Sequence, residues 1–576
     1  MTTSALLELT LSTTFLPATN LQSDAASSDW RFLLPHLSVE RILFIGEPSI
    51  QALSVLSRTC KEIIVICDTL QQSDDIRDKC EDKGIQNTYF KQQDHMSVLP
   101  FSDSDFDLVR LSGRNYKFIY SEAVMSEIHR ILKQDGVIYY EASSLNKYIF
   151  RRTAHKRLLK RFHFSTIGNY WLTPLSGELR TAAPLDNSKI SVYFFRNVLF
   201  GQSLKTRSLS SLGKVLGQTG LLNYLSPRCG VMLRNDSKSA PPSKLPDYLI
   251  ELAEQESLDI SQFTFGFSAR GRYNSNKVIF FLFDRKVATP AYVIKMTRTS
   301  EYNFRLKNEF RALSLLKKNR FLEPGTYPEP VFHGTHNNLA VLCIQAVQGL
   351  PFRSRTSATA DCVIANRAME LILRLGTESA DKGASSSNDV AAALRTLYKR
   401  FIETYSLSSE DQKFLSEKID TLASQSEKFP LVFQHGDPGT WNMFVSESNN
   451  VILLDWESCE PKGMPLWDLF YFFRTYASWM SRKDGTRDSI TSFKNHFLEQ
   501  SALGDRLHDY TDRYCAKIGL NKTLVEPLFY TCWMHRALKE STRLQASNLN
   551  SGSFINLLRL VIEQNNSPGL TRLFLD

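Results

Sequence analysis

The chain has 576 residues, of which 42% are hydrophobic and 22% are charged, a composition typical of globular proteins. Its length is too great for one hydrophobic core, so we expect about three to four domains or two large ones. The formal net charge of +9 permits an anionic ligand or surface, but it gives no reason to expect a nucleic-acid partner.

The nine cysteines are scattered, with no Cys-x-x-Cys pair and no grouping with histidine. An odd, dispersed set favours reduced thiols in the cytoplasm and argues against a zinc site or a disulfide framework. Residues 1–20 have no basic residue before their apolar stretch, so we expect no secretory signal. No apolar run reaches the length that a membrane span requires.

Residues 1–30 are rich in Ser, Thr and Ala, and we expect a weakly ordered lead-in segment or a short accessory helix. Apolar runs at 41–46 and 63–68 then enclose a helical pattern at 50–56. Strands that alternate with helices predict a doubly wound parallel sheet, an α/β fold.

Two further stretches have a recognisable pattern. Residues 99–109 read LPFSDSDFDLV, and residues 126–140 read SEIHRILKQDGVIYY, a helix followed by a strand. They resemble the middle of class I methyltransferases that use S-adenosylmethionine, over residues 31 to 145, with a possible return at 211–235. We therefore expect a methyltransferase-like domain at 31–235 with a basic insertion at 147–205.

The resemblance implies that S-adenosylmethionine would lie at the carboxyl ends of the strands. Gly46 would lie in the first loop, and Asp68, 22 residues further on, and Asp94 would contact the ribose and adenine. The first loop departs from the family, because Gly46-Glu47-Pro48-Ser49-Ile50 offers one glycine, a proline without an N–H, and a branched side chain. We expect this domain to be inactive, although a working methyltransferase stays an alternative.

Residues 147–164 interleave lysine and arginine with aromatic residues and leucine. This composition suits a basic amphipathic helix that lies on an anionic membrane surface or binds a polyanionic chain. It also suits a solvated helix face whose basic side chains cover apolar surface. Residues 236–246 are polar and contain three prolines, so we expect an exposed linker there.

After the linker, residues 265–276 hold two glycines between two candidate strands and could form a turn over phosphates. Lys295 lies in an apolar run at 291–296, and Glu309 lies in a helical pattern at 305–316. Residues 340–349 read as another strand followed by a hinge.

The most informative stretch joins two apolar runs, at 431–445 and 451–457. Asp437 and Asn442 are five residues apart across a loop, and Asp455 follows the second run. Phosphoryl transfer needs a carboxylate to orient or deprotonate the attacking hydroxyl, and oxygen ligands to hold magnesium on the phosphates. These three side chains could supply those roles, although a β-hairpin with incidental acids would also give the pattern.

His435-Gly436-Asp437, Asn442 and Asp455-Trp456-Glu457 resemble the HGDxxxxN and DWE signatures of the aminoglycoside phosphotransferase and choline kinase family. The resemblance implies a bilobal α+β protein-kinase-like domain at 247–576, with a small lobe at 247–350 and a large lobe at 351–576. Asp437 would be catalytic, and Asn442 and Asp455 would bind Mg²⁺.

The resemblance also assigns ATP contacts. Lys295 would bind the phosphates with Glu309 holding it, and the backbone from Gln345 to Val347 would bind adenine. Asp468 would brace the catalytic loop, and the last helices, including 531–544, would form the acceptor pocket.

The two resemblances leave three functional hypotheses open. The first is a kinase that uses ATP and magnesium to phosphorylate a hydroxyl of a small molecule or carbohydrate. The second is a bifunctional methyltransferase and kinase that modifies a glycan or surface polysaccharide. The third is a non-catalytic scaffold, which the intact set of Asp437, Asn442 and Asp455 disfavours.

Overall fold

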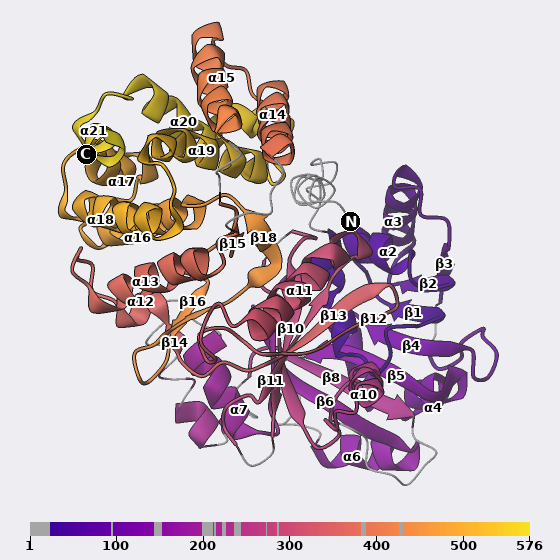
Figure 1. Ribbon diagram of the computed structural model, residues 1–576. Coiled ribbons are helices and arrows are strands. Elements are labelled where there is room, and N and C mark those ends of the chain that lie inside the picture. The colour runs from indigo at the N-terminus through magenta and orange to yellow at the C-terminus, as the bar shows by residue number, and fades with distance from the viewer. Residues whose placement is uncertain are drawn as a thin grey trace. The chain divides into compact units, whose positions relative to one another are not determined.

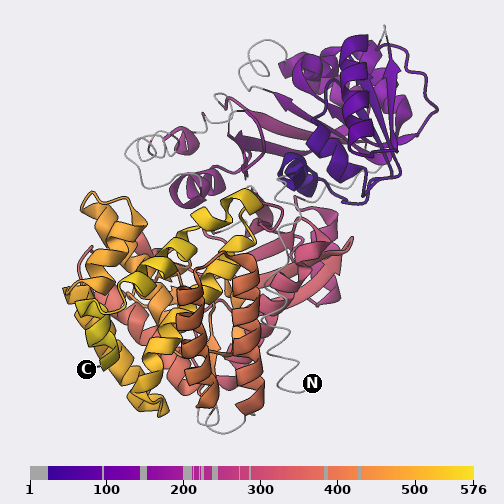
Figure 2. The same ribbon diagram turned by 90° about the horizontal axis from the view of Figure 1, so that it is seen from above.

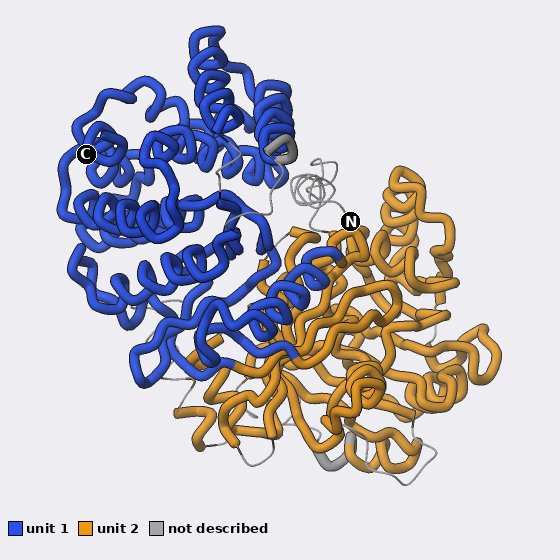
Figure 3. The backbone as a smooth tube through the Cα atoms, in the orientation of Figure 1, with its two compact units in different colours: residues 1–21, 304–330, 347–576 blue, residues 22–303, 331–346 orange. Residues whose placement is uncertain are grey.

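The computed structural model describes residues 24–575, apart from gaps at 94–95, 143–151, 175, 199–210, 212, 214, 220, 222–225, 236–243, 272, 285–286, 382–386 and 426–429 (Figure 1). The described residues form two compact units (Figure 3). Unit 2 contains residues 22–303 and 331–346, and unit 1 contains residues 304–330 and 347–576. No helix in the described part of the chain is long and apolar enough to cross a membrane.

Unit 2 begins its sheet with a parallel part, which confirms the doubly wound fold. Strand β1 (Arg41–Ile45) lies between β2 (Glu62–Cys67) and β4 (Phe106–Leu111), and all three are parallel. Strands β3 (Thr88–Gln92) and β5 (Leu132–Ala142) continue it on either side. The connecting helices are α2 (Ile50–Leu56), α3 (Leu70–Asp82) and α4 (Glu122–Ile131).

Both faces of the central strand β1 are buried. On β1, Ile42 and Phe44 enter one hydrophobic core, and the alternate residues Leu43 and Ile45 enter another. Helices α2 and α3 supply side chains to the first core, and α4 supplies side chains to the second. Two buried faces explain why the strand is apolar throughout instead of alternating.

The sheet does not end at the methyltransferase-like part. Antiparallel strands β8 (Cys229–Asn235), β6 (Phe164–Thr173) and β7 (Thr181–Pro184) follow β5. Strand β7 then pairs with β9 (Thr264–Ser268), which starts the small lobe of the kinase-like part. The small-lobe strands β10 (Lys277–Phe283), β11 (Tyr292–Thr297), β13 (Leu339–Gln345) and β12 (Pro330–His336) complete one thirteen-stranded sheet.

The continuous sheet gives a division that differs from the expected domains. The methyltransferase-like strands and the small-lobe strands belong to one compact unit, and the large lobe forms the other. The expected linker is described only from Lys244, after which Leu245 and Tyr248 are buried in the core of unit 2.

The N-terminal segment also belongs to this core. Residues Asp24–Leu33 form the short helix η1, the helical alternative of the two expected for the lead-in. Asp29 is fully buried and forms two hydrogen bonds with the guanidinium of Arg298, Nε to Oδ1 at 3.0 Å and Nη2 to Oδ2 at 2.6 Å.

The basic stretch at 147–164 lies partly outside the described residues. Its described part forms helix α6 (Arg152–Arg161), where Leu159 is buried in the core while Lys156 and Arg157 are exposed. A helix with one apolar side against the protein fits the solvated-face alternative, and contact with a membrane stays a prediction.

Unit 1 is mostly helical, as Figure 2 shows in orange and yellow. Its helices are α11 (Asn303–Asn319), whose first residue lies in unit 2, α12 (Phe352–Arg355), α13 (Val363–Glu378), α14 (Ser387–Thr404), α15 (Ser409–Ser424), α16 (Trp467–Lys483), α17 (Ser489–Phe493), α18 (Ala502–Ile518), α19 (Val525–Ser541), α20 (Ser553–Glu563) and α21 (Pro568–Leu575). Two small antiparallel sheets join β14 (Leu350–Pro351), β16 (Met443–Val445) and β17 (Val451–Leu453), and β15 (Val432–Gln434) with β18 (Glu460–Gly463).

Candidate active site

The loop that follows β15 carries Asp437. The backbone before Asp437 passes close to Ser458 at Gly436, which has φ +77°. A Cβ added to Gly436 would collide with the carbonyl oxygen of Ser458. Positive φ and this close approach both favour glycine. The His435-Gly436-Asp437 order therefore has a backbone reason as well as a chemical one.

Asp468 holds this loop in place, as the sequence predicts. It lies at the start of α16, and its carboxylate accepts hydrogen bonds from the backbone N–H groups of His435 at 2.6 Å and Gly436 at 3.0 Å. The ring of His435 packs on Trp456, with centroids 4.4 Å apart, and its Nε2 lies 3.0 Å from the Leu454 carbonyl oxygen. His435 is fully buried, so it supports the loop.

The loop brings Asn442 back to Asp437. The Asn442 Nδ2 donates to the Asp437 carbonyl at 3.0 Å and to its Oδ2 at 3.1 Å. The Leu454 N–H donates to the Asn442 carbonyl at 2.8 Å. Asp455 is the next residue after Leu454, so its backbone lies close to Asn442. Unit 1 therefore places Asp437, Asn442 and the chain at Asp455 together.

This arrangement fits a magnesium ion. The amide nitrogen of Asn442 is used by Asp437, which leaves its Oδ1 free to serve as an oxygen ligand. Asp455, a left-handed residue with φ 68°, could add a carboxylate. No group of three or more His, Cys, Asp or Glu that could hold a metal occurs among the described residues. Magnesium does not need one, because it is commonly held by one or two carboxylates with water and substrate phosphates.

Three side chains from two helices surround Asp437. Arg536 Nη1, on α19, lies 3.6 Å from Asp437 Oδ1, and the Tyr471 hydroxyl, on α16, hydrogen-bonds the same carboxyl. Burial opposes the charged form of Asp437, but Lys539, Arg536 and Tyr471 outweigh it and lower the pKa. Asp437 is therefore ionised at neutral pH and can accept a hydrogen bond from a hydroxyl group.

Lys539 joins the two loops of the site. Its Nζ donates to the Gly436 carbonyl at 3.2 Å and to the Ser458 hydroxyl at 2.8 Å. Burial, reinforced by Arg536, lowers the pKa of Lys539 to about 8. Burial raises the pKa of nearby Glu460 to about 7, against the opposing field of Lys539.

The expected ATP contacts are divided between the units. Lys295 is 7% exposed on β11 and belongs to unit 2, whereas Glu309 is fully buried on α11 in unit 1. Gln345 ends β13 in unit 2, and Val347 belongs to unit 1. Their joint action on ATP stays a prediction.

The expected cofactor site in the methyltransferase-like part is crossed by an unexpected side chain. Asn115 Nδ2 donates to Asp68 Oδ1 at 3.1 Å and lies 2.7 Å from where a Cβ on Gly46 would be. Asn115 therefore fills space between the first loop and the acid expected to bind the ribose. Binding of S-adenosylmethionine there stays a prediction. Asp94 lies outside the described residues.

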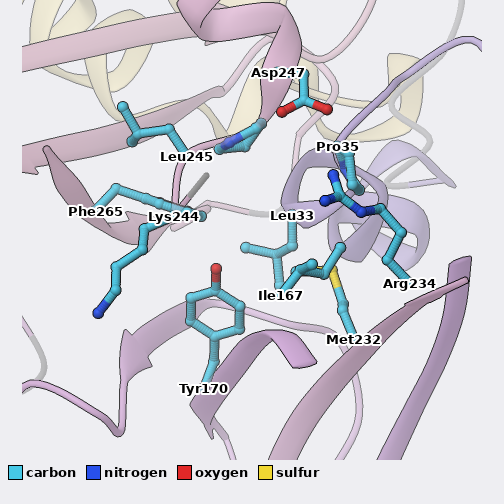
Figure 4. Close-up of a pocket in the computed structure, with 11 residues that line it drawn as sticks. Leu33, Pro35, Ile167, Tyr170, Met232, Arg234, Lys244, Leu245, Asp247 and Phe265 are labelled. Atoms are coloured by element: carbon cyan, nitrogen blue, oxygen red, sulfur yellow. The ribbon is translucent and has the colours of Figure 1, made fainter. Parts of the chain in front are cut away.

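Unit 2 also has a small pocket whose lining includes residues 244–247 (Figure 4). Its apolar lining includes Leu33, Ile167, Met232 and Phe265, and Arg234 and Asp247 stand at its edge in Figure 4. The pocket contains none of the expected site residues, and we assign it no chemistry.

Comparisons with known proteins agree with these two parts. Residues 271–503 match the family model described as the phosphotransferase enzyme family, and residues 45–140 match the model described as a methyltransferase domain. The chain carries a phosphotransferase-family domain and a methyltransferase-family domain. A search of curated proteins gives no significant match.

The solved structures that the chain resembles are distant. Aminoglycoside phosphotransferase APH(3'')-Id from Streptomyces rimosus is 14% identical over 52% of this chain and 98% of its own, with a TM-score of 0.32. The TehB-like SAM-dependent methyltransferase from Corynebacterium glutamicum is 17% identical over 26% of this chain and 77% of its own, with a TM-score of 0.20.

Sequence reasoning did not single out four residues of the two sites, Tyr471, Arg536, Lys539 and Asn115, although it expected residues 531–544 at the acceptor pocket. Arg536 and Lys539 lie about a hundred residues after the Asp437 loop, in a helix that is buried over most of its length. Their spacing of three residues places both on one helix face, but nothing in the sequence indicates which loop that face meets.

Proposed function

We propose that the protein is a phosphotransferase that uses ATP and Mg²⁺ to phosphorylate a hydroxyl group of a small molecule or carbohydrate. The observation that carries this proposal is the contact between Asn442 and Asp437 in a loop braced by Asp468. Such a set orients an acceptor and holds a metal, which is most of what phosphoryl transfer requires of a protein.

In the proposed reaction, the acceptor hydroxyl oxygen forms a bond to the γ-phosphorus as the bond to ADP breaks. The ionised Asp437 accepts the hydrogen bond of that hydroxyl and aligns its oxygen, and the proton leaves through this carboxylate. Magnesium, when bound by Asn442 and Asp455, neutralises phosphate charge. Lys295 would bind the phosphates as a point charge, with Glu309 fixing it.

The test compares wild type with Asp437→Ala in magnesium ATP, with transfer of labelled phosphate to pooled sugars, glycan intermediates and small alcohols as the readout. We expect the variant to lose transfer by a factor on the order of 10²–10⁴. Equal transfer by the two proteins would contradict the assignment of Asp437. A melting curve of each protein controls for folding.

We also propose that the methyltransferase-like part is catalytically inactive. The Asn115 side chain between Gly46 and Asp68 supports this, as does the single glycine of the first loop. The pairing of β7 with β9 supports a structural role, in which this part extends the sheet of the small lobe.

The remaining proposals concern the setting of the enzyme. The scattered cysteines support a cytoplasmic location. Peripheral contact of residues 147–164 with an anionic membrane rests on their basic composition alone.

A further inference from the structure

Six side chains beside Asp437 form a group that we call the arginine–aromatic cluster. They come from five segments of unit 1 and are linked to one another by ring contacts and cation–π contacts. The cluster consists of Arg353, Trp441, Tyr471, Arg474, Arg536 and Phe554.

The contacts run outward from the catalytic carboxylate. Tyr471 hydrogen-bonds Asp437, and the guanidinium carbon of Arg536 lies 3.4 Å from the centroid of the Tyr471 ring. The rings of Trp441 and Phe554 each have their centroid 6.2 Å from that of Tyr471. These contacts place the cluster where the rest of an acceptor would lie while its hydroxyl faces Asp437.

Two arginines form the outer edge of the cluster. The guanidinium carbon of Arg353 lies 5.7 Å from the Trp441 ring, and its Nε donates to the Thr440 hydroxyl at 3.0 Å. The guanidinium carbon of Arg474 lies 4.5 Å from the Phe554 ring, and its Nη2 donates to the Ser553 hydroxyl at 3.2 Å. Both arginines therefore lie against an aromatic ring that borders Tyr471.

Neither arginine has a carboxylate within ion-pairing distance among the described residues of the chain. The Nε atom of Arg474 is buried and has no hydrogen-bond partner within that part. Glu540 acts on Arg474 from a distance, and its carboxylate accepts the N–H of Phe554 at 2.9 Å. The cluster thus carries positive charge on Arg353 and Arg474 that no carboxylate among the described residues pairs with.

Desolvated, unpaired cations are costly to a folded protein. Burial lowers the pKa of both Arg353 and Arg474, and the charge of Arg482 lowers each further. Guanidinium groups match carboxylate and phosphate groups through paired donors. An anionic ligand would offset the unfavourable free energy of these buried positive charges, whereas a polycationic amino sugar would be repelled by them.

Trp441 adds a second requirement. Its side chain is 49% exposed although its ring contacts Tyr471. An exposed indole beside a polar site offers a flat apolar face with little conformational entropy to lose. The carbon-rich face of a sugar ring can pack there while charged substituents reach the arginines.

We propose that the acceptor is an anionic carbohydrate, whose carboxylate or phosphate group binds Arg353 and Arg474 and whose ring packs on Trp441. This inference rests on the proposed phosphotransferase function and names its substrate class. Arg353, Arg474 and Trp441 are specificity-determining residues, because they bind the acceptor away from the reacting atoms.

The experiment uses the full chain with magnesium ATP and four probes: glucuronate, glucose 1-phosphate, glucose and kanamycin. Transfer of labelled phosphate gives kcat/KM, and calorimetry measures the binding of each probe. We expect an anionic probe to exceed glucose by at least about tenfold, with kanamycin the poorest acceptor. The carboxylate and phosphate probes distinguish the two anion chemistries.

Variants connect any preference to the cluster. Arg474→Met should lower kcat/KM for the preferred anionic probe by about ten- to a hundredfold, and Arg353→Met should act in the same direction. Arg474→Lys keeps the charge but loses the paired donors, so it should recover only part of the loss. Arg355→Met is the matched control, because Arg355 is exposed and bonds Asn449 instead.

The outcomes separate this inference from the proposed function. Transfer of labelled phosphate that is absent with all four probes, or the same in Asp437→Ala, removes the proposed function and this inference with it. Turnover that depends on Asp437, but with glucose or kanamycin matching the anionic probes, overturns the inference alone. Failure of both anionic probes to bind or react also overturns it. Melting curves identify a variant that has failed to fold. If Arg474→Met or Arg353→Met does so, the other of the two variants tests whether the cluster binds the anionic group.

Discussion

Lys539, on helix α19, donates a hydrogen bond of 2.8 Å to the hydroxyl of Ser458, which follows Asp455 in the chain. The same amine donates to the carbonyl of Gly436, the residue before Asp437. One side chain from a distant helix thus fixes the spacing of the loop that carries Asp437 and the loop that follows Asp455. Lys539 is a positioning residue, since it acts through both loops.

The charge of Lys539 predicts a pH limit on activity. Burial and Arg536 lower its pKa to about 8, while Asp437 and Glu460 oppose the shift and Arg543 adds to it. We expect kcat to fall as the pH rises through about 8, because the amine loses a proton and with it donor strength. In Lys539→Arg this alkaline limb should move upward beyond the range measured, and Lys539→Met should lower kcat by about ten- to a hundredfold at pH 7.

Stability should change in the opposite sense over this range. The pKa of Lys539 is lower in the folded protein than the ordinary 10.5, so the unfolded chain binds more protons between about pH 8 and 10.5. The contribution of this residue to the free energy of unfolding therefore rises with pH in that window. The exposed Lys517 on α18 provides the control variant, Lys517→Met. If the pH dependence of kcat is unchanged in Lys539→Arg, Lys539 is not the group that sets the alkaline limit.

Asn442 should matter to both the metal and the catalytic carboxylate. Asn442→Ala removes the donor to Asp437 Oδ2 and the oxygen proposed for Mg²⁺. We expect kcat to fall on the order of 10²-fold and the magnesium concentration for half-maximal activity to rise. Titration of magnesium at fixed ATP measures both. Asn556→Ala, at an exposed position on α20, should leave both quantities unchanged, and an Asn442→Ala curve that coincides with wild type would exclude a metal role.

The sequence predicts strands β1 and β2 because each is buried on both faces and carries an unbroken apolar run, as at Ile42 to Ile45. It also predicts the Asp437 loop, because chemistry and backbone geometry restrict that loop at several positions within a few residues. Arg536, Lys539 and Arg474 could not be predicted in the same way. They lie on amphipathic or buried helices, and only packing of those helices decides which basic residue meets the active site.

The continuous sheet is a similar case. No pattern in Thr181 to Pro184 or in Thr264 to Ser268 indicates that these strands pair with each other, because strand pairing between distant segments depends on where the intervening chain returns. The polar, proline-rich composition of residues 236–246 suggested that the two domains are separate. Such a composition indicates an exposed segment, but it carries no information about whether the strands on either side belong to one sheet.

Asn115 predicts the behaviour of the methyltransferase-like part. Since its amide bonds Asp68 and lies against Gly46, we expect no calorimetric signal with S-adenosylmethionine at concentrations up to about 1 mM, the weak end of specific binding. Asn115→Ala tests whether this side chain alone prevents binding. If the variant binds S-adenosylmethionine, the Asn115 side chain is what blocks the site in wild type. Tight binding by wild type would show that the side chain moves aside, and would revive the bifunctional alternative.

The last prediction concerns Asp29, which connects the N-terminal helix to the loop expected over ATP. Arg298, the partner of Asp29, also donates to the carbonyls of Ala269 at 2.8 Å and of Gly271 and Tyr273 at 3.1 Å each. Breaking a buried ion pair by removing one partner costs about 3–5 kcal/mol, so Asp29→Asn should lower the melting temperature.

Because the freed guanidinium would also hold that loop less firmly, Asp29→Asn should raise the KM for ATP more than the KM for the acceptor. Lys61→Met, which removes an exposed ion pair with Glu40, is the control and should change neither quantity by more than surface pairs usually do. If Asp29→Asn lowers stability but leaves the KM for ATP unchanged, Asp29 serves the core of unit 2 and has no part in positioning the loop.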